Sequence, residues 1–202
     1  PAAPIVLRIG ADDGLVLIAT QDGLLHALDL ATGVEQWAFL PQELLARLAG
    51  LRRDEPTTLR SHGLDGPMLL HQHDPDHDGA IDPSAGEHRW LILGLGRGGS
   101  GFYALDLALP AEPRLLWTFD PSGGTAEGRP EPVVTRLSIA DSGQSAGDWV
   151  VLLAGGYDRR FNLPAESTAG AGNRLSVVDA MTGRVLWQAG SEDDAEVTLG
   201  LA

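Results

Sequence analysis

Four aspartates at alternating positions are the residues in this chain that could most readily do chemistry. Asp74, Asp76, Asp78 and Asp82 occupy positions 1, 3, 5 and 9 of one short segment, and Gly79 occupies position 6. A hard divalent cation takes six to eight oxygen ligands, which alternate residues of a tightly turning loop can supply, and the glycine permits the turn. This spacing predicts a calcium-binding loop.

Two further features of the predicted calcium loop concern how the ion's shell is completed. Ala80, at position 7, is expected to offer its backbone carbonyl, and Asp82 to bind directly or through a water molecule. Position 12 is Ala85, where an EF-hand has a glutamate, and the flanking segments read as strands, so the loop lies outside an EF-hand. Glu87 is a candidate for the missing ligand. The alternative is a solvated acidic turn without an ion.

Histidines crowd the same segment. His71, His73 and His77 raise the alternative of a zinc or copper site, since imidazole is a common ligand for those ions. Their spacing does not follow a closed zinc pattern, whereas the aspartate spacing follows a calcium pattern. We expect the three histidines to be exposed loop residues.

A glycine-rich stretch at residues 94–99 satisfies the GxGxxG pattern of dinucleotide-binding proteins. That pattern has meaning only between a strand and a helix, and here the following residues 101–107 alternate like a strand. The glycines are therefore predicted to form a tight link between two strands. The chain has no cysteine, and Ser100 is not placed in a hydrolase elbow, so no catalytic group is predicted and the protein is expected not to be an enzyme.

The overall charge limits the classes of partner. Fourteen basic against twenty-eight acidic residues give a net charge of −14, which repels nucleic acid and anionic lipid. No apolar run approaches the roughly 18 residues that would span a bilayer. The sequence predicts no nucleic-acid partner and no membrane span.

A repeat organises the chain around these sites. Residues 26–30, 103–107 and 176–180 each form a strand-like segment that ends in an aspartate and one further residue. Each is followed by a turn and a second strand, which carries a tryptophan, Trp37, Trp117 or Trp187. A third strand precedes each copy, at residues 15–20, 90–94 and 149–155. A further strand is predicted at residues 67–71 and 132–138. The unit is therefore a four-stranded antiparallel blade.

The predicted fold class is all-β: a β-propeller of which about three four-stranded antiparallel blades are visible, with long loop insertions and one short helix after Pro41. The helix should bury Leu44, Leu45, Leu48 and Leu51. Residues 1–202 are taken as one partial propeller domain, with the calcium loop inserted at about 71–88. Propeller closure takes roughly four to eight blades, so we expect the sequence to be incomplete. Residues 122–132 and 163–172 read as surface loops.

Several motifs together resemble the PilC/PilY family of type IV pilus biogenesis proteins. The stretch DGLLHALD at residues 22–29, with WAF at 37–39 and PQELL at 41–45, looks like that family's propeller signature. His62 with residues 65–66, the GLGRGG of residues 94–99 with GFYALD at 101–106, and GGY at 155–157 resemble later family motifs in the same order. The likeness covers about three quarters of the chain.

This resemblance implies a calcium-binding propeller of a secreted, outer-membrane or cell-surface protein at the pilus. Such a protein would support pilus extension, twitching motility and surface attachment. Its partners would be pilus subunits or minor pilins, and host or surface ligands. The calcium ligands implied for this chain are Asp74, Asp76, Asp78 and Asp82.

Two other classes of protein share parts of these patterns. A quinoprotein dehydrogenase, dependent on pyrroloquinoline quinone, also has blades with glycine and tryptophan motifs and a calcium ion beside its cofactor. This chain lacks the adjacent cysteine pair usual in those enzymes. An outer-membrane assembly scaffold would share the repeat but needs no calcium loop.

Overall fold

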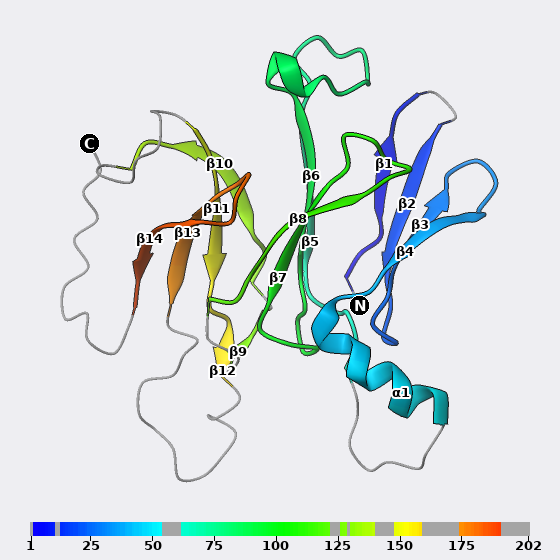
Figure 1. The fold of residues 1–202 in the computed structure, drawn as a ribbon, viewed down its shortest axis with the longest axis vertical. Coiled ribbons are helices and arrows are strands. Elements are labelled where there is room, and N and C mark those ends of the chain that lie inside the picture. Colours follow the sequence, from blue (N-terminus) through cyan, green and yellow to red (C-terminus); the bar gives the residue numbers. More distant parts are fainter. Residues whose placement is uncertain are drawn as a thin grey trace.

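The computed structural model describes residues 2–10, 13–53, 62–121, 126–128, 130–139, 148–158 and 174–190. The loop predicted at residues 163–172 lies outside them. Three separate four-stranded antiparallel sheets lie side by side (Figure 1). In each sheet every strand pairs with the next strand of its own blade, which confirms the predicted blades. No helix among these residues is long and apolar enough to cross a membrane.

Blade 1 follows the alternation of its sequence. Its strands are β1 (Ile5–Arg8), β2 (Gly14–Ala19), β3 (Leu25–Asp29) and β4 (Glu35–Phe39). In β2 and β3, alternate residues such as Leu17 and Ala27 are completely buried and lie opposite each other in the ladder. Because successive side chains of a strand point to opposite faces, one face of blade 1 packs inward and the other faces away.

Blade 2 is buried on both faces. Its strands are β5 (Met68–His73), β6 (His88–Gly94), β7 (Phe102–Asp106) and β8 (Arg114–Phe119). Every residue of β6 is buried, as expected for a strand covered by neighbours on both sides. The glycine-rich residues 95–101 link β6 directly to β7, and the Leu95 N–H donates to the Gly101 carbonyl at 3.0 Å. No helix follows, so the strand-to-strand prediction is confirmed.

Blade 3 repeats the pattern with β10 (Val133–Leu137), β11 (Asp148–Ala154), β13 (Leu175–Asp179) and β14 (Val185–Ala189). A small two-stranded sheet, β9 (Ala126–Glu127) with β12 (Tyr157–Asp158), lies beside it. Gly128 also bridges to Gly96 in the blade 2 link. The prediction of a plain surface loop at residues 122–132 is therefore wrong for 126–128, because this segment pairs with a strand distant in sequence.

A tryptophan on the fourth strand ties each blade to the next. The Trp37 indole N–H donates to the Pro110 carbonyl of blade 2 at 2.8 Å, and the Trp117 N–H donates to the Ala180 carbonyl of blade 3 at 2.8 Å. In all three blades the register shifts directly after the tryptophan's partner on the third strand, because the fourth strand has one extra residue just before its tryptophan. The tryptophans at the end of each repeat are therefore inter-blade anchors.

Two apolar clusters fill the spaces between blades. One joins blades 1 and 2 through aliphatic side chains such as Leu17 and Leu91, and it includes the buried Tyr103. The other joins blades 2 and 3 through Trp90 and Trp117 together with aliphatic side chains of blade 3. Each blade boundary therefore has its own hydrophobic core.

The predicted helix begins as a 3₁₀ turn, η1 (Gln42–Leu44), and continues as α1 (Leu45–Arg53). Leu44 is completely buried, but Leu45 is 58% exposed, so the prediction that Leu45 belongs to the apolar stripe is wrong. The change from a 3₁₀ turn to an α-helix at this point alters the angular spacing on which the stripe was counted. The buried Tyr103 hydroxyl donates to the Glu43 carboxylate and so fastens η1 to blade 2.

Candidate metal centre

The acidic loop joins the first two strands of blade 2. Residues 74–87 connect β5 to β6, and the ladder beneath them runs without interruption from the Met68–Leu93 pair to the His73–His88 pair. The loop contains a 3₁₀ turn, η2 (Pro83–Ala85). It projects from the end of the blades opposite α1 (Figure 1). The placement between two strands agrees with the prediction that this is not an EF-hand.

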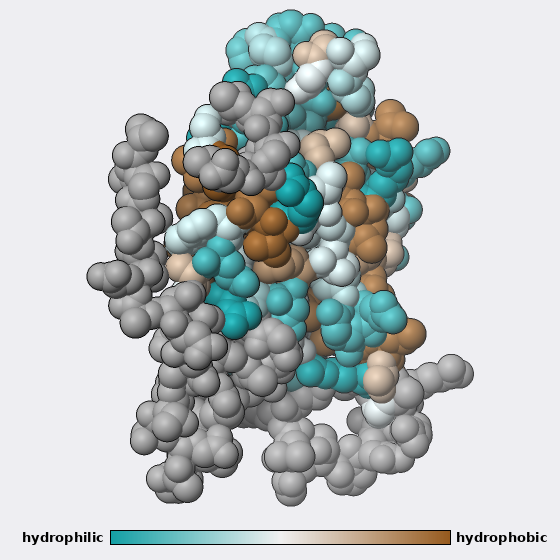
Figure 2. All heavy atoms as spheres, turned by 60° about the vertical axis from the view of Figure 1, so that its left-hand side comes forward, coloured by the Kyte–Doolittle hydropathy of each residue, from teal (hydrophilic) through white to brown (hydrophobic). Residues whose placement is uncertain are grey.

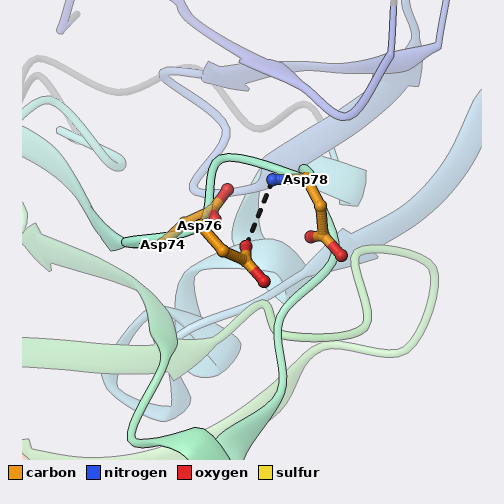
Figure 3. A group of neighbouring side chains, drawn as sticks. All are labelled: Asp74, Asp76 and Asp78. Carbon is orange, nitrogen blue, oxygen red and sulfur yellow. Dashed lines mark hydrogen bonds between the residues drawn. The ribbon is translucent and has the colours of Figure 1, made fainter.

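Three of the predicted ligands come together. The side chains of Asp74, Asp76 and Asp78 each offer an oxygen, and these oxygens lie within 4.8 Å of one another (Figure 3). The Asp78 N–H donates to the Asp76 carboxylate at 3.2 Å, which turns the chain so that both side chains point to the same side. Among the described residues this is the one group of three or more such side chains close enough to share an ion.

Backbone donors organise the Asp74 carboxylate. The N–H of His77 donates to one of its oxygens at 2.8 Å and the N–H of Gly79 to the other at 3.2 Å. Desolvation raises the pKa of Asp74, but hydrogen bonding with Asp76 and from these N–H groups outweighs it, so its pKa lies below the usual value. The carboxylate is thus kept ionised, as a calcium ligand must be.

Gly79 is needed for two separate reasons. Its φ of +82° is a left-handed conformation that strains any other residue except asparagine or aspartate. A Cβ atom at this position would lie 2.6 Å from the Ile9 carbonyl oxygen, which follows β1 in blade 1. The middle of the loop therefore rests against blade 1, although both of its ends belong to blade 2.

Arg89 anchors the acidic loop to blade 2. This role was not predicted from the sequence. The side chain is only 1% exposed, and its guanidinium donates to the Gly79 carbonyl and to the Gln72 side chain, each at 3.0 Å. Burial lowers its pKa, while the nearby Asp74 carboxylate raises it. An arginine at the start of a strand gives no local signal of such a contact, because the contact depends on how the loop folds back.

Ala80 and Asp82 lie outside the group of three carboxylates. Ala80 is exposed, and its N–H donates to the Asp78 side chain at 2.8 Å. One Asp82 oxygen accepts from the backbone N–H and the hydroxyl of Ser84, which caps η2 and lowers the pKa of Asp82. The buried Glu87 carboxylate accepts a hydrogen bond from the Asp82 N–H at 2.9 Å and so stabilises the loop.

The histidines are placed differently from the prediction. His77 is exposed, with a φ of +60°, as expected for a loop residue. His71 and His73 lie instead on β5 and are half-buried, so the prediction that they are exposed loop residues is wrong. They pack with His88 against Trp149 of blade 3, at ring-centroid distances of 4.7 Å for His71 and 5.4 Å for His73. Burial here comes from a neighbouring blade and is invisible in the local pattern.

Two of these imidazoles have nitrogen atoms sealed away from water. The Nε2 atoms of His71 and His88 are buried and have no hydrogen-bond partner among the described residues. Burial lowers the pKa of His88 to about 4 and also lowers that of His71. His88 stacks on Trp90 with ring centroids 3.6 Å apart. These rings therefore act as neutral, aromatic packing groups between blades 2 and 3.

The fold and the loop together define a class: a β-propeller segment in which one blade carries an acidic hairpin loop. No family model matches the chain. Among curated proteins, the type IV pilus biogenesis factor PilY1 of Pseudomonas aeruginosa strain UCBPP-PA14 is 31% identical over 147 residues, which cover 70% of this chain and 11% of the relative. A PilY1 homolog of Xylella fastidiosa is 31% identical over 144 residues, covering 70% and 10% respectively.

A solved structure of a PilY1 domain has a similar fold. The C-terminal domain of Pseudomonas aeruginosa PilY1 matches with a TM-score of 0.57 and 24% identity, over 93% of this chain and 32% of that chain. The chain belongs to the PilY1 family, as its motifs predicted. It spans about a tenth of the length of the curated relatives it matches.

Proposed function

We propose that this chain is a non-enzymatic, calcium-binding propeller segment that serves type IV pilus biogenesis. The observation that carries the calcium proposal is the convergence of three carboxylates within 4.8 Å in a loop with backbone donors already in place. Three close negative charges repel one another unless a cation lies between them. The family relationship supports the role in pilus biogenesis, since the matched relatives are named for it.

The ion would be bound by Asp74, Asp76 and Asp78, with the Ala80 carbonyl and Asp82 completing its oxygen shell. Asp82 would contribute directly or through water while one of its oxygens continues to cap η2. Because Gly79 rests on blade 1 and is held by Arg89 of blade 2, an ordered loop would stiffen the junction of these two blades. Calcium would thereby order a surface of the propeller and would have no catalytic role.

At the level of the cell, the proposal extends to pilus extension, twitching motility and surface attachment. The protein would be secreted and held at the outer membrane or cell surface, at the pilus. Pilus subunits or minor pilins would be its partners, together with host or surface ligands. The net charge of −14 supports a calcium-dependent surface and disfavours nucleic acid as a partner.

Thermal unfolding with excess calcium and with chelator tests the metal centre. An ion that binds only the folded chain adds about 2.7 kcal/mol of stability at a calcium concentration one hundred times Kd. The Asp78→Ala variant should bind calcium at least about tenfold more weakly and lose most of this gain, since a hard cation depends on its carboxylate ligands. In the chelator it should unfold like the parent chain.

Glu112→Ala is the matched control, because Glu112 is an exposed carboxylate in the β7–β8 turn of the same blade. It should keep the full response to calcium. If the parent chain shows no calcium-dependent shift, residues 74–82 are a solvated turn and the calcium proposal fails. Deletion of the corresponding loop in a bacterium, scored for pilus extension and twitching, tests the cellular role separately.

A further inference from the structure

One carboxylate of the acidic loop is more closely attached to blade 2 than the other two. Asp74 is half-buried, whereas Asp76 and Asp78 are exposed, and Figure 2 shows hydrophilic atoms covering the projecting end of this blade. Besides its two backbone donors within the loop, Asp74 accepts a hydrogen bond at 3.0 Å from the side-chain amide of Gln72 on β5. The loop is therefore joined to a strand by a side chain as well as by the backbone.

Gln72 in turn contacts a buried cation. It lies directly opposite Arg89 in the β5–β6 ladder, and its side-chain oxygen accepts from the Arg89 guanidinium at 3.0 Å. An amide side chain accepts at one end and donates at the other, so Gln72 connects the guanidinium to the Asp74 carboxylate. A longer contact of 3.5 Å joins Arg89 to the Leu107 carbonyl at the end of β7. Neighbouring strands thus fix the position of the guanidinium.

The same guanidinium also orients one peptide group of the loop. It donates to the Gly79 carbonyl at 3.0 Å, and the other side of that peptide, the Ala80 N–H, donates to the Asp78 carboxylate at 2.8 Å. In a trans peptide the C=O and N–H groups point in opposite directions, so the two hydrogen bonds together set its plane. Arg89 is therefore connected to Asp78 through this peptide and to Asp74 through Gln72.

A cation close to a metal site can have two opposite effects on the affinity for calcium. Its charge repels the ion and so weakens binding. Its hydrogen bonds hold the ligands in place, which strengthens binding because less order has to be created when the ion arrives. A planar guanidinium donates to several acceptors in fixed directions, whereas the ammonium group of a lysine acts more like a point charge. The three acceptors around Arg89 favour the positioning effect.

We propose that Arg89 and Gln72 are positioning residues of the metal centre, which hold the empty acidic loop in the shape that accepts calcium. The inference rests on the proposed calcium function, but it makes a separate claim about the loop without an ion. Groups that orient metal ligands from outside the ligand shell typically change metal affinity about 10–100-fold when they are removed. The ion would then bind to a loop that blade 2 has already ordered.

Amide hydrogen exchange in excess chelator, followed by NMR, tests the empty loop. The N–H groups of His77 and Gly79 both donate to Asp74, so they should be protected in the parent chain. Gln72→Met removes the connection to Arg89 at an exposed position. The two amides should then exchange about tenfold faster, the equivalent of one hydrogen bond, while the amides of β6 keep their protection.

Calorimetric titration with calcium separates positioning from charge. Gln72→Met should bind calcium about tenfold more weakly than the parent chain. Arg89→Lys keeps the charge but loses the planar fork, and it should also bind at least about tenfold more weakly. If the cation acted through its charge alone, both variants would bind like the parent chain. Gln36→Met is the matched control, because Gln36 is an exposed glutamine on β4 of blade 1, and it should change neither affinity nor exchange.

The outcomes separate this inference from the calcium proposal. A parent chain that binds no calcium overturns the proposed function, and exchange in chelator still decides whether the two residues hold the loop. If the parent chain binds calcium but Gln72→Met leaves either the affinity or the exchange of the loop unchanged, the inference alone is overturned. Because Arg89 is buried, Arg89→Lys can also destabilise the blade, and in that case the exposed Gln72→Met decides.

Discussion

Between blades 1 and 2 the buried side chains are almost all aliphatic, whereas between blades 2 and 3 two tryptophans are buried and three imidazoles pack against Trp149. Both boundaries contain the same tryptophan-to-carbonyl hydrogen bond of 2.8 Å. Trp117 is only 6% exposed, but Trp37 remains half-buried. The repeated hydrogen bond fixes how blades meet, and the surrounding side chains decide how stable and how pH-sensitive each boundary is.

The largest expected effect comes from truncating the two tryptophans in turn. Trp117→Ala should lower the free energy of unfolding by about 3–5 kcal/mol, since it removes a large buried side chain and leaves a cavity. Trp37→Ala should cost clearly less, because its ring is partly in solvent. Denaturant unfolding at low protein concentration measures both. Equal losses would contradict the difference between the boundaries.

Acid should act on the boundary between blades 2 and 3. The pKa of His88 is lowered from 6.5 to about 4, so the unfolded chain takes up a proton at a higher pH than the folded chain. This contribution to stability is complete above pH 6.5 and is lost as the pH falls toward 4, by at most about 1.4 kcal/mol per pH unit. His71, His73 and the Arg136 cation beside Trp149 face the same imidazole, and the positive charges among them act in the same direction.

The acid effect can be isolated with His88→Phe, which keeps an aromatic ring on Trp90 but cannot titrate. In excess chelator, which removes any contribution of calcium, this variant should lose less stability between pH 6.5 and 4 than the parent chain. His71 still titrates, so part of the slope should remain. A variant with the parent chain's slope would show that acid acts elsewhere.

The smallest expected effect distinguishes two glycines with the same backbone conformation. Gly33→Ala should cost about 1–2 kcal/mol, because only the left-handed conformation is penalised. Gly183→Ala should cost more, since its Cβ must also displace the Trp117 ring. Unfolding of both variants under identical conditions gives the difference. If the two losses are the same, the close approach of Trp117 to the turn is not needed for stability.

Local patterns were sufficient to predict the blades and the spacing of the acidic loop. Alternation and turn residues predict strands such as β6 and β11 directly. The spacing of the aspartates is enough to predict an acidic loop suited to a divalent cation. Asp74, Asp76 and Asp78 are close in sequence, so a single loop can bring them together. The placement of the ion itself remains a prediction.

Contacts between blades could not be predicted in the same way. The burial of His71 depends on Trp149, the support of the loop depends on Arg89, and β9 pairs with a strand some thirty residues away. Each of these depends on how separate sheets stack, which no window of sequence describes. Leu45 was assigned wrongly for a local reason, because the helix opens with a 3₁₀ turn and its apolar stripe is shifted.

The order of the strands within each blade has a consequence for how the chain folds. Every strand pairs with the next strand of its own blade, so a sheet needs no contribution from distant sequence to be complete. Such local pairing shortens the loops that must close and speeds folding. Each sheet can therefore form as soon as its last strand is made.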